Sequence, residues 1–142
     1  MHPTVHANQF RRTVLSILIF AFLIPWFAIA QNPQMKTAAA EILWEAARRG
    51  DLGKVKQAIE SGVDVNEKTN YGASALSFAA DRGHLEVVQY LLAKQADPNV
   101  KDSFYNATPI TWAEIGNRYD IMKALVLAGA TDVDMTLVKA VA

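Results

Sequence analysis

The 142-residue sequence contains no cysteine, and its charge shows no excess of either sign. Without a thiol the chain cannot form a disulfide framework, a thiolate metal site or a cysteine nucleophile, and it cannot carry a lipoprotein anchor. Lysine and arginine total 14, as do aspartate and glutamate. The clustered basic excess that is typical of nucleic-acid binders is therefore missing, and we expect no nucleic-acid partner.

The N-terminal segment 1–30 has the pattern of an export signal. Arg11 and Arg12 precede an almost wholly apolar run from Val14 to Ala30. This run ends in Ala28-Ile29-Ala30, which has the small-x-small form of a cleavage site. We expect cleavage after Ala30 and a periplasmic or secreted protein. The alternative is an uncleaved anchor in the inner membrane, because the apolar run approaches the length of a membrane span.

The remaining sequence repeats itself with a period of about 33 residues, a length typical of repeat proteins. The segment 79–88 matches an earlier copy at 46–55 and a later copy at 113–122, and the second shift is longer than the first by one. Such a period indicates stacked repeats, because a single unit cannot bury its apolar face alone. We expect a polar tether and the start of the first helix at 31–40, a repeat domain at 41–134 with units at about 41–70, 71–104 and 105–134, and a capping helix at 135–142.

Each unit has the pattern of two short helices. In the middle unit we expect helices over 75–81 and 85–94, separated at Gly83. The second of these helices carries one apolar stripe at helical spacing, formed by Val87, Val88, Leu91 and Leu92. The first unit has a more polar stripe, as is expected of a terminal repeat that meets water on one side.

The ends of the second helices call for a residue with left-handed backbone. Gly62 and Gly129 suit this position, because glycine adopts that conformation without strain. Gln95 occupies it in the middle unit, at an expected cost of up to about 1 kcal/mol. Asn106 and Asn117 replace two further glycines of the repeat, and asparagine is the next most tolerant residue.

These features resemble the ankyrin repeat. Its T-P-L-H-x-A signature appears as Thr108-Pro109-Ile110-Thr111-Trp112-Ala113 and, more loosely, as Ser74-Ala75-Leu76-Ser77-Phe78-Ala79. Ser77 and Thr111 replace the signature histidine, and the first unit has no such signature. The resemblance implies an all-α solenoid of three to four stacked helix pairs with short β-hairpin loops. A tetratricopeptide array has a similar period but lacks the hairpin segment.

Catalytic and metal sites have weak support. Gly72-Ala73-Ser74 begins like a nucleophile elbow, but the second glycine of that motif is missing. A serine hydrolase would depend on His84, the only histidine outside the leader, whose place in the repeat already explains it. Calcium requires six to eight converging oxygens, more than Asp64, Glu67, Asp132 and Asp134 indicate. We expect no enzyme, cofactor or metal, with a His84-dependent hydrolase as a remote alternative.

The resemblance implies that a partner protein is recognised through a concave groove of inner helices and through the hairpin tips. Tyr71, Phe104 and Tyr105 fall at these tips, where rigid aromatic side chains are candidate hot spots. The alternative is that some of them fold back over the adjacent repeat. The candidate groove residues are Arg48, Arg49, Asp81 and Arg82, with ordinary solvated charges as the alternative. Trp44, Phe78 and Trp112 are expected in the core.

We therefore expect a monomeric, non-catalytic interaction protein of the cell envelope whose partner is another exported protein. It would hold or protect an envelope enzyme. The alternative is an immunity protein that neutralises a toxic effector.

Overall fold

The computed structural model describes residues 33–133, with side chains from Thr37 onward. The chain divides into two compact units, Met1–Thr37 and Ala38–Ala142, and nearly all described residues belong to the second. The expected leader and the expected capping helix at 135–142 lie outside the described residues. No helix among the residues described here is long and apolar enough to cross a membrane.

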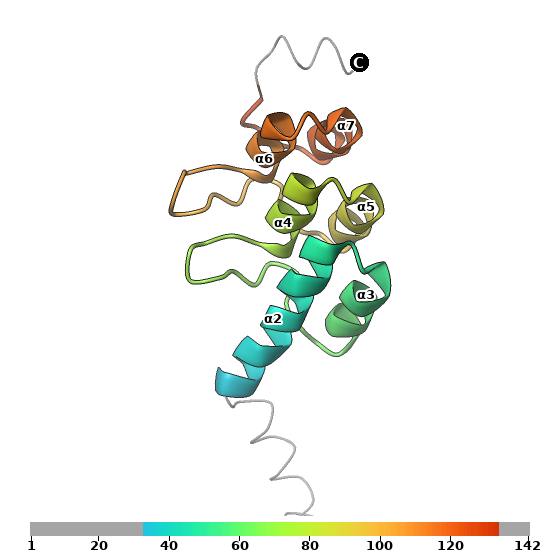
Figure 1. Cartoon of the computed structure of the whole chain (residues 1–142), viewed down its shortest axis with the longest axis vertical. Coiled ribbons are helices and arrows are strands. Elements are labelled where there is room, and N and C mark those ends of the chain that lie inside the picture. Colours follow the sequence, from blue (N-terminus) through green and yellow to red (C-terminus); the bar gives the residue numbers. More distant parts are fainter. Residues whose placement is uncertain (1–32, 134–142) are drawn as a thin grey trace, which may run out of the picture. The chain divides into compact units, whose positions relative to one another are not determined.

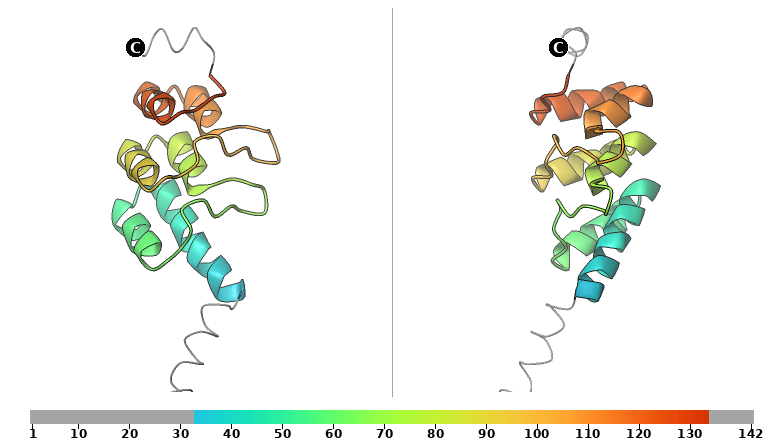
Figure 2. Two further views of the ribbon diagram at one scale, coloured as in Figure 1. Left: turned by 180° about the vertical axis from the view of Figure 1, so that it is seen from behind. Right: turned by 90° about the vertical axis from the view of Figure 1, so that its left-hand side faces the viewer.

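The described part of the chain forms six helices and no strand, arranged as three consecutive pairs (Figure 1). The first helix of each pair, here called inner, is α2 (Pro33–Arg49), α4 (Ala75–Arg82) or α6 (Pro109–Ile115). The second, outer helix is α3 (Leu52–Glu60), α5 (Leu85–Ala93) or α7 (Tyr119–Leu127). The loops 61–74 and 94–108 extend on the side of the inner helices (Figure 2). The expected all-α repeat architecture is confirmed.

Helix α2 begins at Pro33, within the segment 31–40 where we expected a polar tether and the start of the first helix. Proline is favoured at the first helical position, because its φ angle is preset and the N–H that it lacks would have no acceptor within the helix. Ala38, Ala39 and Ala40 then have the highest helix propensity of any residue type. The stretch that we expected as a tether is therefore helical from Pro33 onward.

The core lies between inner and outer helices and runs through all three pairs. The outer helices contribute large side chains, such as Val88 and Leu91 of α5 and Leu125 of α7, which are fully buried. The inner helices contribute mainly alanines, including Ala79 and Ala113, which are also fully buried. Small side chains let neighbouring inner helices approach closely.

The three outer helices end in the same way. After α5, the N–H of Gln95 bonds to the carbonyl of Leu92 at 2.9 Å, and that of Ala96 bonds to the carbonyl of Leu91 at 3.0 Å. This is the Schellman motif, and it requires left-handed backbone at Gln95, where φ is +66°. Asn106 and Asn117 both have φ of +55°, as expected from their alignment with glycine.

Replacing Gln95 with glycine is expected to raise the free energy of unfolding by about 1 kcal/mol, because glycine adopts this conformation without strain from a Cβ. The matched control is Gly62→Gln, which puts the same side chain at the same place in the first unit, where φ is +97°. That change should lower stability by a similar amount. Chemical denaturation measures both. A Gln95→Gly protein no more stable than the wild type would contradict the assignment of strain.

Asn66 and Asn99 each link one turn to the next. The side-chain oxygen of Asn66 accepts from the N–H of Asp97 at 2.8 Å, and its amide nitrogen donates to the carbonyl of Gln95 at 3.3 Å. Asn99 makes the corresponding bonds with the N–H of Thr131 at 2.8 Å and the carbonyl of Gly129 at 3.1 Å. These roles were not predicted, although the recurrence of asparagine in two equivalent turns was an available signal.

The hydroxyl residues that replace the signature histidine complete the N-terminal caps of α4 and α6. Ser74 Oγ accepts from the N–H of Ser77 at 3.2 Å, and the two hydroxyl oxygens lie 3.2 Å apart. In the third unit, Thr111 Oγ1 accepts from the N–H of Thr108 at 3.3 Å, and the hydroxyl oxygens are 3.0 Å apart. The starts of α4 and α6 are therefore fixed without the histidine.

The loops contain less β-structure than the resemblance implied. Among the described residues, an isolated antiparallel bridge joins Lys68 to Ser74, and neither loop forms a strand. The first loop turns through a bond from the N–H of Gly72 to the carbonyl of Thr69, at 2.8 Å. Turn hydrogen bonds, rather than a strand ladder, hold these loops.

Candidate protein-binding surface

The exposed sides of the inner helices and the loop tips form what we call the inner-helix face. Repeat alignment gives two rows on the helices, with Glu45, Phe78 and Trp112 in one and Arg48, Asp81 and Ile115 in the other. The loop tips add Tyr71, Phe104 and Tyr105. All of these positions are exposed or half-exposed.

Aromatic side chains gather at the second loop and α6. The Phe104 and Tyr105 rings meet edge to face with centroids 4.7 Å apart, and Tyr105 meets Trp112 in the same manner at 5.7 Å. Phe104 and Tyr105 nevertheless remain 71% and 69% exposed. Tyr105 thus leans on its own repeat and does not fold back over the core of a neighbour. We call Phe104, Tyr105 and Trp112 the aromatic cluster.

A buried carboxylate holds the aromatic cluster in place. Asp102 Oδ1 accepts from the backbone N–H groups of Phe104 at 3.0 Å and Tyr105 at 2.7 Å. Its Oδ2 accepts from the indole N–H of Trp112 at 3.1 Å. Because one side chain fixes both the loop backbone and the indole, the cluster is ordered before any partner binds. Asp102 is only 6% exposed.

Asp102 was not among the residues predicted from the sequence. It lies three residues after Asn99, and Thr69 stands at the same distance after Asn66. Thr69 Oγ1 accepts from the N–H of Ala73 at 3.2 Å. At this equivalent position of the first loop, a side-chain oxygen therefore also binds the loop backbone. The alignment of these two acceptors was the sequence signal that could have revealed the role.

The tips of the two loops are joined. The N–H of Ser103 donates to the carbonyl of Tyr71 at 2.8 Å. Gly72 has a φ of +75°, and a Cβ there would lie 3.1 Å from the carbonyl oxygen of Lys101. A side chain at this position would therefore be strained and crowded. Glycine lets the first loop approach the second, and Tyr71 is held beside it with 67% of its surface exposed.

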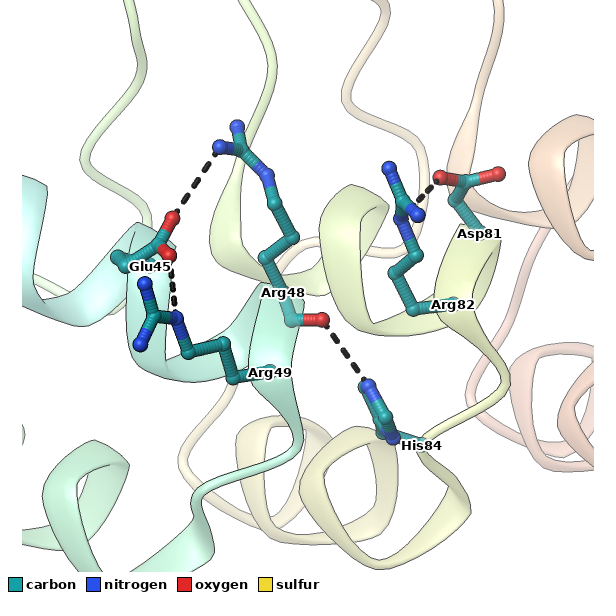
Figure 3. A network of polar contacts seen from close by, with 6 residues as sticks. All are labelled: Glu45, Arg48, Arg49, Asp81, Arg82 and His84. Atoms are coloured by element: carbon teal, nitrogen blue, oxygen red, sulfur yellow. Dashed lines mark hydrogen bonds and ion pairs between the residues drawn. The ribbon is translucent and has the colours of Figure 1, made fainter.

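The charged candidates at the ends of the inner helices are paired with one another or with Glu45 (Figure 3). Arg48 Nη1 lies 3.2 Å from Glu45 Oε2, Arg49 Nε binds Glu45 Oε1, and Arg82 Nε lies 3.2 Å from Asp81 Oδ2. The hydrogen bond from Arg49, with the positive charges of Arg49 and Arg48, holds the pKa of Glu45 below its ordinary value. Such exposed pairs add little stability.

Arg48 also contacts an aromatic ring of the next repeat. Its guanidinium carbon lies 4.4 Å from the centre of the Phe78 ring. This contact joins α2 to α4 on the inner-helix face and fixes the direction of the arginine side chain. Arg48 is thus more than a solvated charge, because it takes part in the packing between two repeats.

Two of the three aromatics expected in the core lie at its edge instead. Phe78 and Trp112 are only partly buried and lie on the inner-helix face. Ala79 and Ala113 follow them in sequence and point into the core, and one residue's rotation along a helix turns the preceding side chain away. Trp44 does pack against the core, and its indole N–H donates to the carbonyl of Glu67 at 3.1 Å.

His84 has a structural role between repeats. Its Nε2 lies 3.0 Å from the carbonyl oxygen of Arg48 (Figure 3). The ring also packs against Gly50, where a Cβ would come within 2.5 Å of Nδ1. Arg118 takes this place in the third unit and packs against Gly83. The histidine on which the hydrolase alternative depended therefore serves to join α2 to the turn before α5.

The residues considered for a cation site do not converge. Within residues 37–133, where side chains are described, no group of three or more histidine or acidic side chains is arranged to hold a metal ion. Asp132 instead pairs with Lys101 at 3.6 Å. Asp134 lies outside the described residues.

Residues 43–136 match the family described as ankyrin repeats, three copies. The chain belongs to the ankyrin-repeat family. Ankyrin repeats are protein–protein interaction modules, which agrees with a surface of exposed aromatic side chains on a scaffold of stacked helices. The three copies agree in number with the three helix pairs of the described residues.

The ankyrin-repeat part is similar to segments of much longer proteins. It is 38% identical over 93 residues to the mitochondrial disaggregase of Homo sapiens, an alignment that covers 66% of this chain and 13% of that protein. It is 40% identical over 72 residues to the palmitoyltransferase AKR1 of Lachancea kluyveri, covering 48% and 10%. Ankyrin repeat domain-containing protein 63 of Homo sapiens is 38% identical over 72 residues, covering 51% and 19%. The chain thus spans less than a fifth of these relatives.

Proposed function

We propose that this ankyrin-repeat protein binds another exported protein through its inner-helix face and catalyses no reaction itself. The observation that carries the proposal is the aromatic cluster, which is exposed and yet held in position by Asp102. Large aromatic side chains contribute most to binding when they lose little conformational freedom on association. A cluster that is ordered beforehand meets this condition.

The proposed compartment is the cell envelope, and the support for it is the leader pattern of residues 11–30. A partner must share that compartment, so we propose a resident envelope enzyme that this protein holds or protects. An immunity protein would use the same surface to cover the active site of a toxic effector. The identity of a captured partner distinguishes these two versions.

Tyr105→Ala is expected to weaken partner capture by roughly thirtyfold, the equivalent of about 2 kcal/mol for a hot-spot aromatic. The matched control is Tyr119→Ala. Tyr119 is 64% exposed, close to the 69% of Tyr105, but it begins the outer helix α7. Both variants and the wild type are used as bait in an envelope extract, and the bound proteins are quantified by mass spectrometry.

One specific protein should be retained by the wild type and by Tyr119→Ala, and lost from Tyr105→Ala. Equal capture by the two variants would show that the aromatic cluster is not the binding surface. Capture of no specific protein by any of the three would contradict the proposed function as a whole.

A further inference from the structure

The two junctions between successive inner helices differ at equivalent places. At the first junction, Arg48 of α2 lies over the ring of Phe78 in α4, at 4.4 Å. The repeat alignment puts Asp81 at the position of Arg48 and Trp112 at the position of Phe78 in the second junction. The second junction therefore has the better aromatic acceptor for a cation, since indole exceeds phenyl in this respect. In place of the cation it has a carboxylate.

We propose that Trp112 and Asp81 form a subsite for an arginine side chain of the partner protein. The partner's guanidinium would lie over the indole as that of Arg48 lies over Phe78, and would pair with the Asp81 carboxylate. This inference rests on the proposed function and adds to it the chemistry of one residue that the partner presents.

The indole is held in a fixed orientation and is still accessible. Its N–H is bonded to Asp102 Oδ2, and Tyr105 contacts it edge to face. Trp112 is partly buried by these contacts and is not enclosed by them. The proposed guanidinium would stack on the part of the ring that these contacts leave exposed, and Tyr105, edge to face with the indole, would add a second aromatic wall to the subsite.

The carboxylate of Asp81 can exchange its present contact for a new one. Arg82 approaches it through a single nitrogen, Nε, which lies 3.2 Å from Oδ2. The Asp81 side chain is 40% exposed and the Arg82 side chain is 59% exposed. Exposed pairs of this kind are weak. Figure 3 shows Asp81 and Arg48 on neighbouring inner helices, both directed away from His84. Asp81 in α4 thus points to the same side as Arg48 does in α2, which is the equivalent position of the preceding repeat.

Arginine fits this pair of groups better than lysine does. Its planar guanidinium stacks on an aromatic face and at the same time presents several N–H donors at its edge to a carboxylate. An acidic partner residue would be repelled by Asp81. A neutral apolar residue would cover the indole but would leave the carboxylate without a charged partner.

The test is an NMR titration of the purified, ¹⁵N-labelled protein with N-acetyl-arginine N-methylamide as the probe. The indole N–H resonance of Trp112, assigned through Trp112→Phe, is followed together with that of Trp44. We expect a saturable shift at Trp112 alone. The same titration with the citrulline derivative, which has nearly the same shape but no charge, should give a shift smaller on the order of fivefold.

Two variants locate the response. Asp81→Arg should abolish the shift, because the new guanidinium would itself occupy the place over Trp112, as Arg48 does over Phe78. Asp120→Asn, which removes an exposed carboxylate from α7, should leave the shift unchanged. Equal shifts with the arginine and citrulline probes, or no shift with either, would overturn the inference.

The NMR titration and the partner capture test different claims, so the arginine subsite and the proposed function can be rejected independently. If Tyr105→Ala loses a specific partner and the arginine probe gives no shift, the arginine subsite is wrong and the proposed function stands. If the probe binds as expected and no protein is captured, the subsite is supported and the proposed protein partner is not.

Discussion

Replacing Leu91 with alanine is expected to lower the free energy of unfolding by about 2 to 5 kcal/mol. Leu91 has no exposed surface, and it lies in α5, the outer helix that packs between α3 and α7. The change removes apolar burial and leaves a cavity in the middle of the stack, where both neighbouring repeats lose contacts. Urea denaturation followed by circular dichroism measures the loss.

Leu127→Ala is the matched control for this measurement. Leu127 ends α7 and is 79% exposed, so the same change of side chain should alter stability by no more than about 0.5 kcal/mol. A single domain of this size has a total stability of about 5 to 15 kcal/mol, so Leu91→Ala can remove a large part of it. Equal effects of the two changes would contradict the burial of Leu91 between the repeats.

Asp102→Ala is expected to weaken partner capture by roughly tenfold while every aromatic side chain is retained, because the cluster is no longer preorganised for binding. The variant leaves the N–H groups of Phe104, Tyr105 and Trp112 without their acceptor, and the second loop then loses its fixed shape. Loss of such a buried acceptor should also lower the free energy of unfolding by about 1 to 3 kcal/mol. Envelope-extract capture and denaturation measure the two effects.

Asp97→Ala is the appropriate comparison, because Asp97 is an exposed turn residue whose Oδ1 accepts one backbone hydrogen bond, from Asn99 at 2.9 Å. Its removal should change partner capture little. If Asp102→Ala captured the partner as well as the wild type, preorganisation of the aromatic cluster would have no part in binding.

The helices and their ends could be predicted because they depend on local sequence. The stripe through Val88 and Leu91 has the period of a helix, and the residues at Gln95 and Asn117 follow from the positions of glycine in the other units. The start of α2 could not be placed in the same way. A polar segment without apolar periodicity gives no signal, although Pro33 favours the beginning of a helix.

The candidate surface was less predictable, because it depends on which way side chains turn. The sequence indicates that Phe104 and Tyr105 fall in a loop, but not that a buried Asp102 orders them. It also gives no direct sign that Phe78 and Trp112 turn toward the inner-helix face. Their direction follows from the next residues, Ala79 and Ala113, which enter the core although they are smaller than the aromatic residues before them.

The bonds made by Asn66 and Asn99 run in one direction, from each turn to the turn that follows. Each turn therefore makes the same bonds to the turn after it, so the array can be lengthened by whole periods. The segment 67–99 is one whole period, and a tandem copy of it can be inserted after Asn99. Asn99 would then bind the copied carbonyl of Gln95 and the copied N–H of Asp97, as Asn66 now binds the originals. The asparagine of the copy would then bind Gly129 and Thr131. Gene duplication could extend such a protein without the invention of a new interface.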